Sequence, residues 1–367
     1  MTKIAIVADV HLGYSGRSND ILWALRTVRN YCQNNDIDTV VVLGDLFHDR
    51  QHLSIEILCG AYDFFRETKF GYNQQWIAFP GNHDMFLKHS WNINSIRPLG
   101  ELLTIVDTVK VLEIDDRRYW VLPFVYSESA YMRILQRIEK QSSKEDVLLT
   151  HVGVNNAIQN ICFLLQRWSM VTFIQSKFDR VYAGHFHLCQ QVGDNLWYPG
   201  SLLPYKFDEG DHDHGFFVFD QDKNEHEFIN ILEQGRLLQP NIEPPPQYCT
   251  FTVDLLDQKT EAQVRGNVIR IATDRDYTPN EYQEIRDRFT EMGAKKITFI
   301  NLSEDDTPHD QLAELEPIKI EDLFAKWFDQ DLRGAKDLRR NLAIRLNREI
   351  VDEGNEIYAK RADPDAI

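Results

Sequence analysis

The stretch VVVLGDLFH (residues 40–48) joins a short apolar run, a glycine and a polar loop. Val40, Val41 and Val42 are β-branched, and an unbroken apolar run of this length favours a strand buried on both faces. Gly44 permits the sharp turn that follows such a strand. Asp45 and His48 then lie just beyond its end, where α/β proteins commonly bind ligands. The stretch therefore predicts a sheet with a polar site along one edge.

Four other apolar segments are followed by polar residues of the same kinds. These motifs are Asp9-Val10-His11, Gly81-Asn82-His83-Asp84, Thr150-His151 and Gly184-His185-Phe186-His187. The five strands that precede the motifs are predicted over Lys3–Ala8, Thr39–Leu43, Trp76–Phe79, Val147–Thr150 and Arg180–Ala183. Two more strands are predicted over Arg118–Leu122 and Phe216–Asp220, and helices over Asp20–Tyr31 and Ser54–Arg66. Because every motif follows a strand, we expect the five loops to converge on one rim of the sheets.

The side chains in these motifs are of the kinds that bind divalent metal ions. Carboxylate oxygen, amide oxygen and imidazole nitrogen suit Mn²⁺, Fe²⁺, Zn²⁺ or Mg²⁺, whereas the absence of cysteine from the motifs argues against a structural zinc. Two ions about 3.5–4 Å apart need a shared ligand, and a carboxylate such as that of Asp45 can bridge them. The motifs together predict a two-metal centre.

The composition limits the class of protein. With 367 residues the chain is long enough for two or three domains. Its five cysteines are odd in number and lack C-x-x-C spacing, and MTKIAIVADV at the start lacks a basic segment and a cleavage site, so we expect a reduced, cytoplasmic protein. No apolar run approaches the length of a membrane span. The net charge of −17 is opposite to that expected of a nucleic-acid binder.

Three prolines in EPPPQ (residues 243–247) predict a break between two domains. We expect a catalytic domain over residues 1–240 and a small α/β cap over 248–302. The cap is predicted to contain a strand at Gly266–Thr273, a helix at Pro279–Met292 and a strand at Lys295–Asn301. Residues 303–317, with six acids and two prolines, predict a solvated linker. Residues 318–367 are predicted to form two helices, over Glu321–Asp329 and Lys336–Ala359.

The ordered set D-x-H, G-D, G-N-H-D, H and G-H-x-H resembles that of the calcineurin-like metallophosphoesterase superfamily. This resemblance implies an α+β fold, a four-layer α/β/β/α sandwich, followed here by the βαβ cap and the helical pair. More narrowly, the chain resembles the SbcD/MRE-eleven nucleases, including phage recombination nuclease subunits. The narrower resemblance depends on His48 three residues after Asp45, on the segment Tyr198-Pro-Gly-Ser201 after G-H-x-H, and on the small cap with its helical C-terminus.

The resemblance implies a role for each residue of the motifs. One ion would be bound by Asp9, His11, Asp45 and His187, and the other by Asp45, Asn82, His151 and His185. The catalytic residues would be His83, which protonates the leaving oxygen or stabilises the transition state, and His48, which contacts a substrate phosphate. The ions would be Mn²⁺, with Mg²⁺ as the alternative. The implied function is that of a DNA exonuclease and endonuclease subunit in recombination and repair.

The resemblance also implies partners. The nuclease would form a homodimer and bind an SMC-like ATPase of the SbcC/Rad-fifty type through residues 318–367. In the second predicted helix of that segment, apolar residues recur every four positions, at Leu338, Leu342, Leu346 and Ile350. Candidate DNA contacts in the cap are Arg265, Arg270, Lys295 and Lys296, although a merely solvated face explains these charges equally well.

Two alternatives to a DNA nuclease remain open at this point. A small-molecule phosphodiesterase or a protein phosphatase could use the same metal scaffold, and the acidic net charge favours this alternative. A non-catalytic scaffold is disfavoured because the ligand set is complete. The tract Asp211-His212-Asp213-His214 is predicted to be a solvated loop. Trp23, Trp76 and Trp168 lie at apolar spacings and are predicted to be core residues.

Overall fold

The computed structural model describes residues 3–87, 90–154, 157–160, 163–164 and 178–301. The acidic linker and the two C-terminal helices predicted from the sequence lie outside these residues, as does Trp168. Across the described ranges, no helix is long and apolar enough to cross a membrane.

The first sheet has six strands in the order β16-β15-β1-β2-β3-β6. The strands β1, β2, β3 and β6 are parallel, whereas β15 pairs antiparallel with both β1 and β16. Their bounds are β1 Lys3–Val7, β2 Thr39–Val42, β3 Gln75–Ala78, β6 Thr104–Ile105, β15 Gly215–Asp220 and β16 Glu225–Asn230. The four strands of this sheet predicted from the sequence are thus confirmed.

The second sheet also has six strands, in the order β13-β14-β12-β9-β8-β7. Its bounds are β7 Lys110–Ile114, β8 Arg117–Leu122, β9 Val147–His151, β12 Arg180–Gly184, β13 Gln190–Val192 and β14 Leu196–Tyr198. Strands β8, β9, β12 and β14 are parallel, with antiparallel β7 and β13 at the edges. The three predicted strands of this sheet are confirmed, but its edge strands were not predicted.

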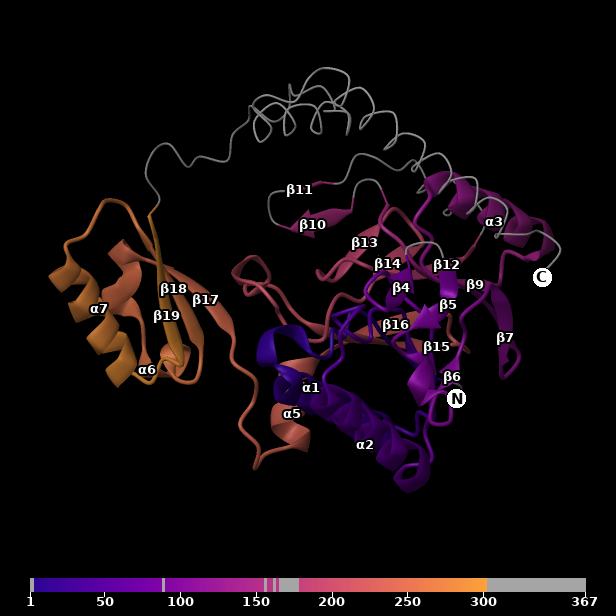
Figure 1. The fold of residues 1–367 in the computed structure, drawn as a ribbon, viewed down its shortest axis with the longest axis horizontal. Helices are drawn as coiled ribbons and strands as arrows, with labels where there is room; N and C mark the ends of the chain where they lie inside the picture. Colours follow the sequence, from indigo (N-terminus) through magenta and orange to yellow (C-terminus); the bar gives the residue numbers. More distant parts are fainter. Residues whose placement is uncertain (1–2, 88–89, 155–156, 161–162, 165–177, 302–367) are drawn as a thin grey trace, which may run out of the picture. The chain divides into compact units, whose positions relative to one another are not determined.

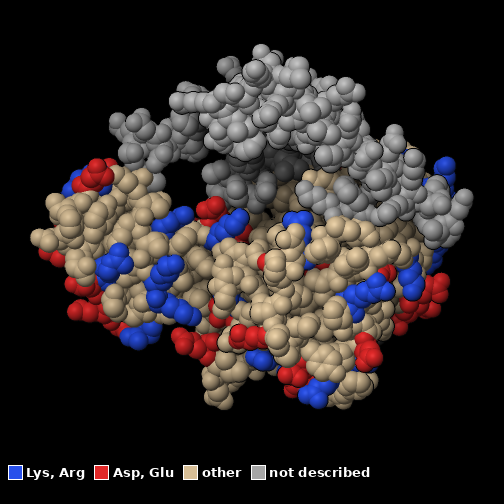
Figure 2. All heavy atoms as spheres, viewed as in Figure 1, with Lys and Arg blue, Asp and Glu red and all other residues tan. Residues whose placement is uncertain are grey.

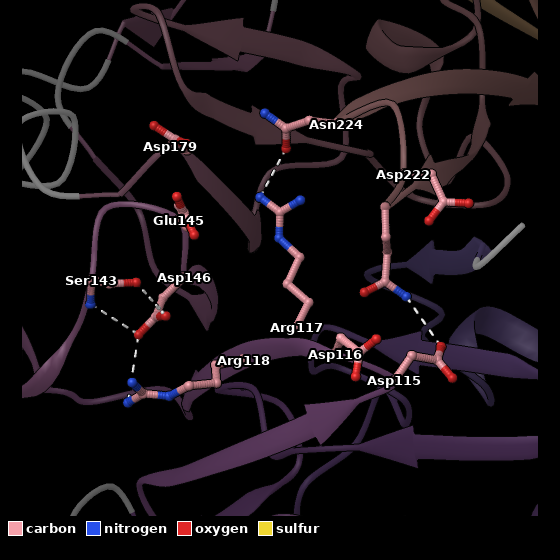
Figure 3. Close-up of a pocket in the computed structure, with 11 residues that line it drawn as sticks. Asp115, Asp116, Arg117, Arg118, Ser143, Glu145, Asp146, Asp179, Asp222 and Asn224 are labelled. Atoms are coloured by element: carbon pink, nitrogen blue, oxygen red, sulfur yellow. Dashed lines mark hydrogen bonds and ion pairs between the residues drawn. The ribbon is translucent and has the colours of Figure 1, made fainter.

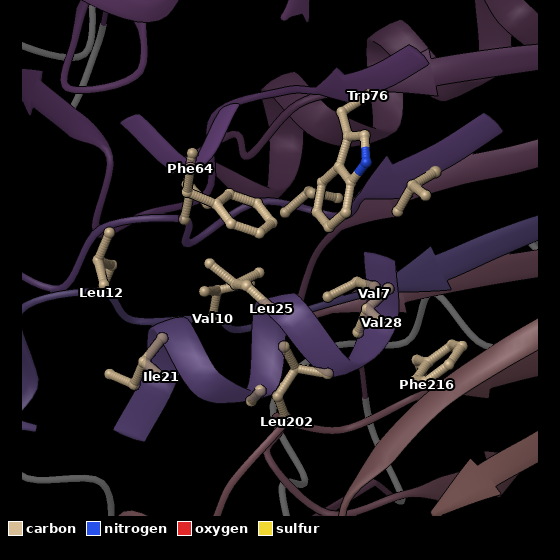
Figure 4. Close-up of a cluster of buried hydrophobic side chains, with 14 of the residues drawn as sticks. Val7, Val10, Leu12, Ile21, Leu25, Val28, Phe64, Trp76, Leu202 and Phe216 are labelled. Carbon is tan, nitrogen blue, oxygen red and sulfur yellow. The ribbon is translucent and has the colours of Figure 1, made fainter. Parts of the chain in front are cut away.

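The alternation of side chains along the strands builds two apolar layers. In β1, Ala5 and Val7 face the core beneath helices α1 (Ser18–Asn34) and α2 (Ile55–Gly71), part of which Figure 4 shows. Ile4 and Ile6 point to the other side, where they share a core with residues of the second sheet such as Tyr182. Both faces of the central strands are therefore covered, which explains their continuous apolar sequence.

The outer face of the second sheet is covered by α3 (Glu128–Gln141). Tyr131 of this helix lies 3.0 Å from the hydroxyl of Thr150 in β9, and Leu135 and Ile138 are buried. In Figure 1, α3 lies on the opposite side of the strands from α1 and α2. The layers are thus helix, sheet, sheet and helix, as the resemblance implied. Trp23 and Trp76 are buried, which confirms their prediction as core residues.

Residues after the prolines form a separate three-stranded parallel sheet in the order β17-β18-β19. Its elements are β17 Tyr248–Thr252, α6 Glu261–Val264, β18 Val268–Thr273, α7 Pro279–Glu291 and β19 Lys296–Asn301. A core of its own includes Phe251, Ile269, Ile271 and Phe289. Thr278 and Glu281 form a capping box that begins α7. The predicted strand–helix–strand unit is present, and β17 extends it by one strand.

Candidate metal centre

The polar motifs lie at the same ends of strands from both sheets. Asp9 and His11 follow β1, Asp45 follows β2, and Asn82 and His83 follow β3. His151 is the last residue of β9, and His185 and His187 follow β12. Four of these residues have left-handed backbones, with φ of 49° at Asp9 and His11, 52° at Asp45 and 115° at His185. Such strain in non-glycine residues is typical of functional sites.

Three glycines allow the loops to approach one another closely. A Cβ atom on Gly81 would overlap Asp45, and one on Gly44, whose φ is +84°, would overlap His151 and Gly81. A Cβ atom on Gly184 would overlap the carbonyl oxygen of Leu43. The loops after β2, β3 and β12 are therefore in direct contact, and the glycines make that contact possible.

The residues predicted for the first ion lie together. Nε2 of His11 is 3.1 Å from Nε2 of His187 and 3.8 Å from Oδ2 of Asp45. Asp9, His11 and His187 each offer a ligand atom within 4.8 Å of the other two. Both oxygens of Asp9 also accept the backbone N–H of His185 at 3.0 Å, which joins this group to the loop after β12.

The residues predicted for the second ion also lie together, and their hydrogen bonds fix which atoms are free. Nδ1 of His151 donates to the carbonyl oxygen of Leu43 at 2.8 Å, so Nε2 presents a lone pair. That lone pair faces Oδ1 of Asn82 at 2.9 Å and Oδ2 of Asp45 at 3.5 Å. Nδ1 of His185 lies 3.0 Å from the same amide oxygen. No hydrogen lies between Nε2 of His151 and either oxygen, and a divalent ion bound there would relieve the repulsion between these lone pairs.

The protonation equilibria of the site show the cost of burying these groups. Burial raises the pKa of Asp45 to about 6, and burial together with the nearby Asp45 carboxylate raises the pKa of Asp9 well above its ordinary value. Burial lowers the pKa of His151 and of His185 to about 3, and it also lowers the pKa of His11. A bound cation favours ionised carboxylates and so offsets the cost of burying them, whereas burial by itself keeps the imidazoles in the neutral form that can bind a metal ion.

The two predicted catalytic histidines stack beside this cluster. The rings of His48 and His83 are 5.1 Å apart with an angle of 18° between their planes, and His83 meets the ring of His11 edge-on at 4.8 Å. Nδ1 of His83 donates to the backbone oxygen of His48 at 2.7 Å, and its backbone N–H donates to Oδ1 of Asp45 at 2.7 Å. Nδ1 of His48 lies 3.3 Å from Nδ1 of His11. His83 is thus oriented by Asp45 and by the His48 loop.

Two buried carboxylates support the site and were not assigned a role from the sequence. Asp84 accepts the backbone N–H groups of Leu46, Phe47 and Gly81, and so fastens the loop after β2 to the loop after β3. Burial and the nearby Asp45 raise the pKa of Asp84 to about 7. Glu209 accepts Nδ1–H of His187 at 2.9 Å. Asp84 belongs to a recognised motif, but no local pattern identifies Glu209.

The four candidate DNA contacts lie in the β17–β19 sheet and its connections. Lys295 and Lys296 are exposed, and Arg265 pairs with Glu261. Arg270 packs over the ring of Phe207 at 4.6 Å and lies 3.7 Å from Asp208, so its charge is already partnered.

In the tract Asp211–His214, the first three residues are exposed as predicted, but His214 is buried, which corrects that part of the prediction. Its burial is possible because both ring nitrogens have polar neighbours, the backbone oxygen of Glu209 at Nε2 and the residue Ser201 at Nδ1.

A cavity of about 540 Å³ lies away from this cluster, at the other ends of the strands of the second sheet (Figure 3). Arg117 and Arg118 at the start of β8 line it, together with Asp146 before β9 and Asp179 before β12. Arg117 donates to Asn224 at 2.8 Å. None of the metal-binding candidates lines this cavity, so it is separate from the histidine and aspartate cluster.

The family model for calcineurin-like phosphoesterases matches residues 2–189 of the chain. The chain belongs to the calcineurin-like phosphoesterase family. Members of this family hydrolyse phosphoester bonds, and the described residues of this calcineurin-like phosphoesterase include three groups of histidines and aspartates that could hold a metal ion.

Individual relatives of this phosphoesterase are distant. It is 26% identical over 183 residues to a putative phosphoesterase of Invertebrate iridescent virus 3. This match covers 47% of this chain and 50% of the relative. It is 26% identical over 245 residues to the DNA double-strand break repair protein Mre11 of Archaeoglobus fulgidus. This match covers 56% of this chain and 51% of the relative. The chain thus spans about half the length of either relative.

Among solved structures, the phosphoesterase is similar to a dimetal phosphatase from Danio rerio. The identity is 14% and the TM-score is 0.36, with 59% of this chain and 91% of the other covered.

Proposed function

We propose that this phosphoesterase is a two-metal DNA nuclease subunit that acts in recombination and repair. The observation that carries the proposal is the set of converging lone pairs on His151, Asn82 and Asp45. The backbone N–H of His83 donates to Asp45, and its ring lies against that of His11. The likeness to an archaeal protein named for DNA double-strand break repair supports DNA as the substrate.

In this proposal one ion is held by Asp9, His11, Asp45 and His187, and the other by Asp45, Asn82, His151 and His185. When bound, two divalent ions such as Mn²⁺ supply Lewis acidity toward the phosphate and acidify water. Asp45 contributes twice, because Oδ2 faces both groups of donors while Oδ1 holds the backbone of His83.

His83 is the proposed proton donor to the leaving oxygen. Its Nδ1 hydrogen is used in the bond to the backbone oxygen of His48, so Nε2 must carry the second proton of the imidazolium form in order to transfer it to the leaving oxygen. His48 is partly exposed and stacks on His83, where it can contact a phosphate next to the one that is cleaved. Burial lowers the pKa of His48, so its ring acts mainly as a neutral hydrogen-bonding group at neutral pH.

The charge distribution favours the alternative of a small phosphodiester substrate or a phosphorylated protein. The net charge is −17, and on the face shown in Figure 2 basic and acidic side chains of the described residues are interspersed. A DNA-binding surface is usually a continuous basic patch. Bound divalent ions offset part of this acidity at the site itself.

The proposed function also includes partners. We expect a homodimer that binds a coiled-coil ATPase of the SbcC/Rad-fifty type through residues 318–367. The support is the sequence: Leu323, Phe324, Trp327 and Phe328 are bulky residues at helical spacing, and the stripe from Leu338 to Ile350 follows them.

The deciding experiment compares three substrates with the Mn²⁺-loaded full chain: single-stranded DNA, double-stranded DNA and bis-p-nitrophenyl phosphate. A DNA nuclease is expected to cleave at least one form of DNA with a kcat/KM far above that for the chromogenic ester. Hydrolysis of the ester without cleavage of either DNA would favour the small-molecule alternative.

A further inference from the structure

The second buried carboxylate beside the metal cluster, Glu209, is in the short helix η3 (Phe207–Glu209). Glu209 is only 5% exposed, and it lies 22 residues beyond His187 in the chain. Oε1 of Glu209 accepts Nδ1–H of His187 at 2.9 Å, and Oε2 accepts the backbone N–H of Tyr205 at 2.7 Å. Both oxygens of the carboxylate are therefore used, each by a single donor.

The hydrogen bond to Glu209 determines which nitrogen of His187 can bind a metal. An ionised carboxylate only accepts hydrogen bonds, so Nδ1 of His187 must carry the hydrogen. The lone pair of the ring is then on Nε2, the atom that lies 3.1 Å from Nε2 of His11. With the other tautomer, a hydrogen on Nε2 would point at the cluster and prevent coordination.

The position of Glu209 is itself fixed by the surrounding structure. Its backbone oxygen meets Nε2 of His214 at 3.0 Å, and His214 is buried. Tyr205, whose N–H the carboxylate accepts, donates its hydroxyl to the backbone oxygen of Val10, in the loop between Asp9 and His11. The segment that carries Glu209 is thus attached to the first metal-binding loop as well as to His187.

We propose that Glu209 is a positioning residue that holds His187 as an Nε2 ligand of the first ion. The inference rests on the proposed metal centre but not on DNA as the substrate. Carboxylate partners of metal-binding histidines typically contribute about 10- to 100-fold to metal affinity.

Glu209→Gln and Glu209→Ala separate a positioning role from a packing role. In Glu209→Gln the amide oxygen is needed by the N–H of Tyr205, so the NH₂ group faces His187 and donates to Nδ1. The hydrogen of the ring then moves to Nε2 and occupies the ligand position. Although glutamine keeps the size and shape of glutamate, we expect it to lower Mn²⁺ affinity at the first ion at least as much as alanine does, by about 10- to 100-fold.

Mn²⁺ binding to the full chain is measured by titration calorimetry and by the number of bound equivalents, without any substrate. Asp211→Asn, which removes an exposed carboxylate two residues further on, is the matched control and should bind as the unmodified chain does. A Glu209→Gln protein with two ions at full affinity would overturn the proposal. The proposal would also be overturned if Glu209→Gln bound Mn²⁺ normally while Glu209→Ala did not. That result would show that only the size and packing of the side chain matter.

One measurement needs no variant of Glu209 and therefore stands even if those variants fail to fold. In metal-free protein labelled with ¹⁵N-histidine, the His187 signals, assigned with a His187→Asn variant, should show a hydrogen on Nδ1. A hydrogen on Nε2 would contradict the proposal. Neither readout uses DNA or any phosphoester. The positioning role of Glu209 can therefore fail while the nuclease assay succeeds, and the nuclease assay can fail while the positioning role holds.

Discussion

Asp45 lies between the two groups of donor atoms. Its Oδ2 is 3.8 Å from Nε2 of His11 and 3.5 Å from Nε2 of His151. If it bridges both ions, Asp45→Ala should remove hydrolytic activity and most of the bound metal together, as measured by elemental analysis of the purified protein. Asp49→Ala, at an exposed position four residues later, is the control. Two full equivalents of metal in Asp45→Ala would rule out the bridge.

His83 contacts the cluster without being a proposed ligand. His83→Ala should therefore keep both ions while kcat falls by about two orders of magnitude or more, since general acid catalysis typically contributes that much. Metal content and kcat are measured on the same preparation. Loss of one ion in this variant would instead make His83 a ligand.

Among the elements, the contact between the loops after β2 and β3 depends on Gly81. A methyl group there would overlap Oδ1 and N of Asp45. Gly81→Ala should displace Asp45, lower the free energy of unfolding by about 1–3 kcal/mol and weaken metal binding. Gly71→Ala at the end of α2 meets nothing closer than 3.7 Å and should leave metal binding unchanged. Denaturant unfolding and Mn²⁺ titration of both variants test this, and equal metal affinity would contradict it.

Strands that are covered on both faces can be predicted from the sequence. Edge strands, and residues that act through contacts distant in the sequence, cannot. β1 and β2 read as continuous apolar runs because helices cover one face and the second sheet the other. Edge strands such as β7 and β16 are partly exposed, so their sequences lack that signal. Glu209 could not be found because its role depends on a hydrogen bond to a residue 22 positions away. The motifs themselves are local, and the structure brings all seven candidate ligands together.

For the small cap, the proposed role in DNA handling depends on the exposed pair Lys295 and Lys296. Lys295→Glu with Lys296→Glu should weaken DNA binding while hydrolysis of a small phosphodiester stays unchanged, because each phosphate contact adds a salt-dependent attraction. Binding is measured at two salt concentrations. If neither activity changes, the cap does not contact DNA.

At the scale of the whole molecule, residues 318–367 are the proposed attachment site for the ATPase. Deleting them should leave a metal-loaded enzyme that hydrolyses simple phosphodiesters but no longer co-purifies with the ATPase. A chain that unfolds or loses its ions on truncation would show that these residues belong to the catalytic core.

The pairing of β1 with β15 has a consequence for how the chain is made. Lys3–Ile6 pair with residues 217–220, so one edge of the central first strand lacks its partner until more than two hundred further residues have been synthesised. At the usual rates of translation, of about 5–20 residues per second, this interval lasts roughly ten to forty seconds. During that time an apolar strand edge is available to other chains, and the last two histidines of the metal cluster are absent for most of it. This edge of β1 is therefore paired only after all seven candidate metal ligands have been synthesised.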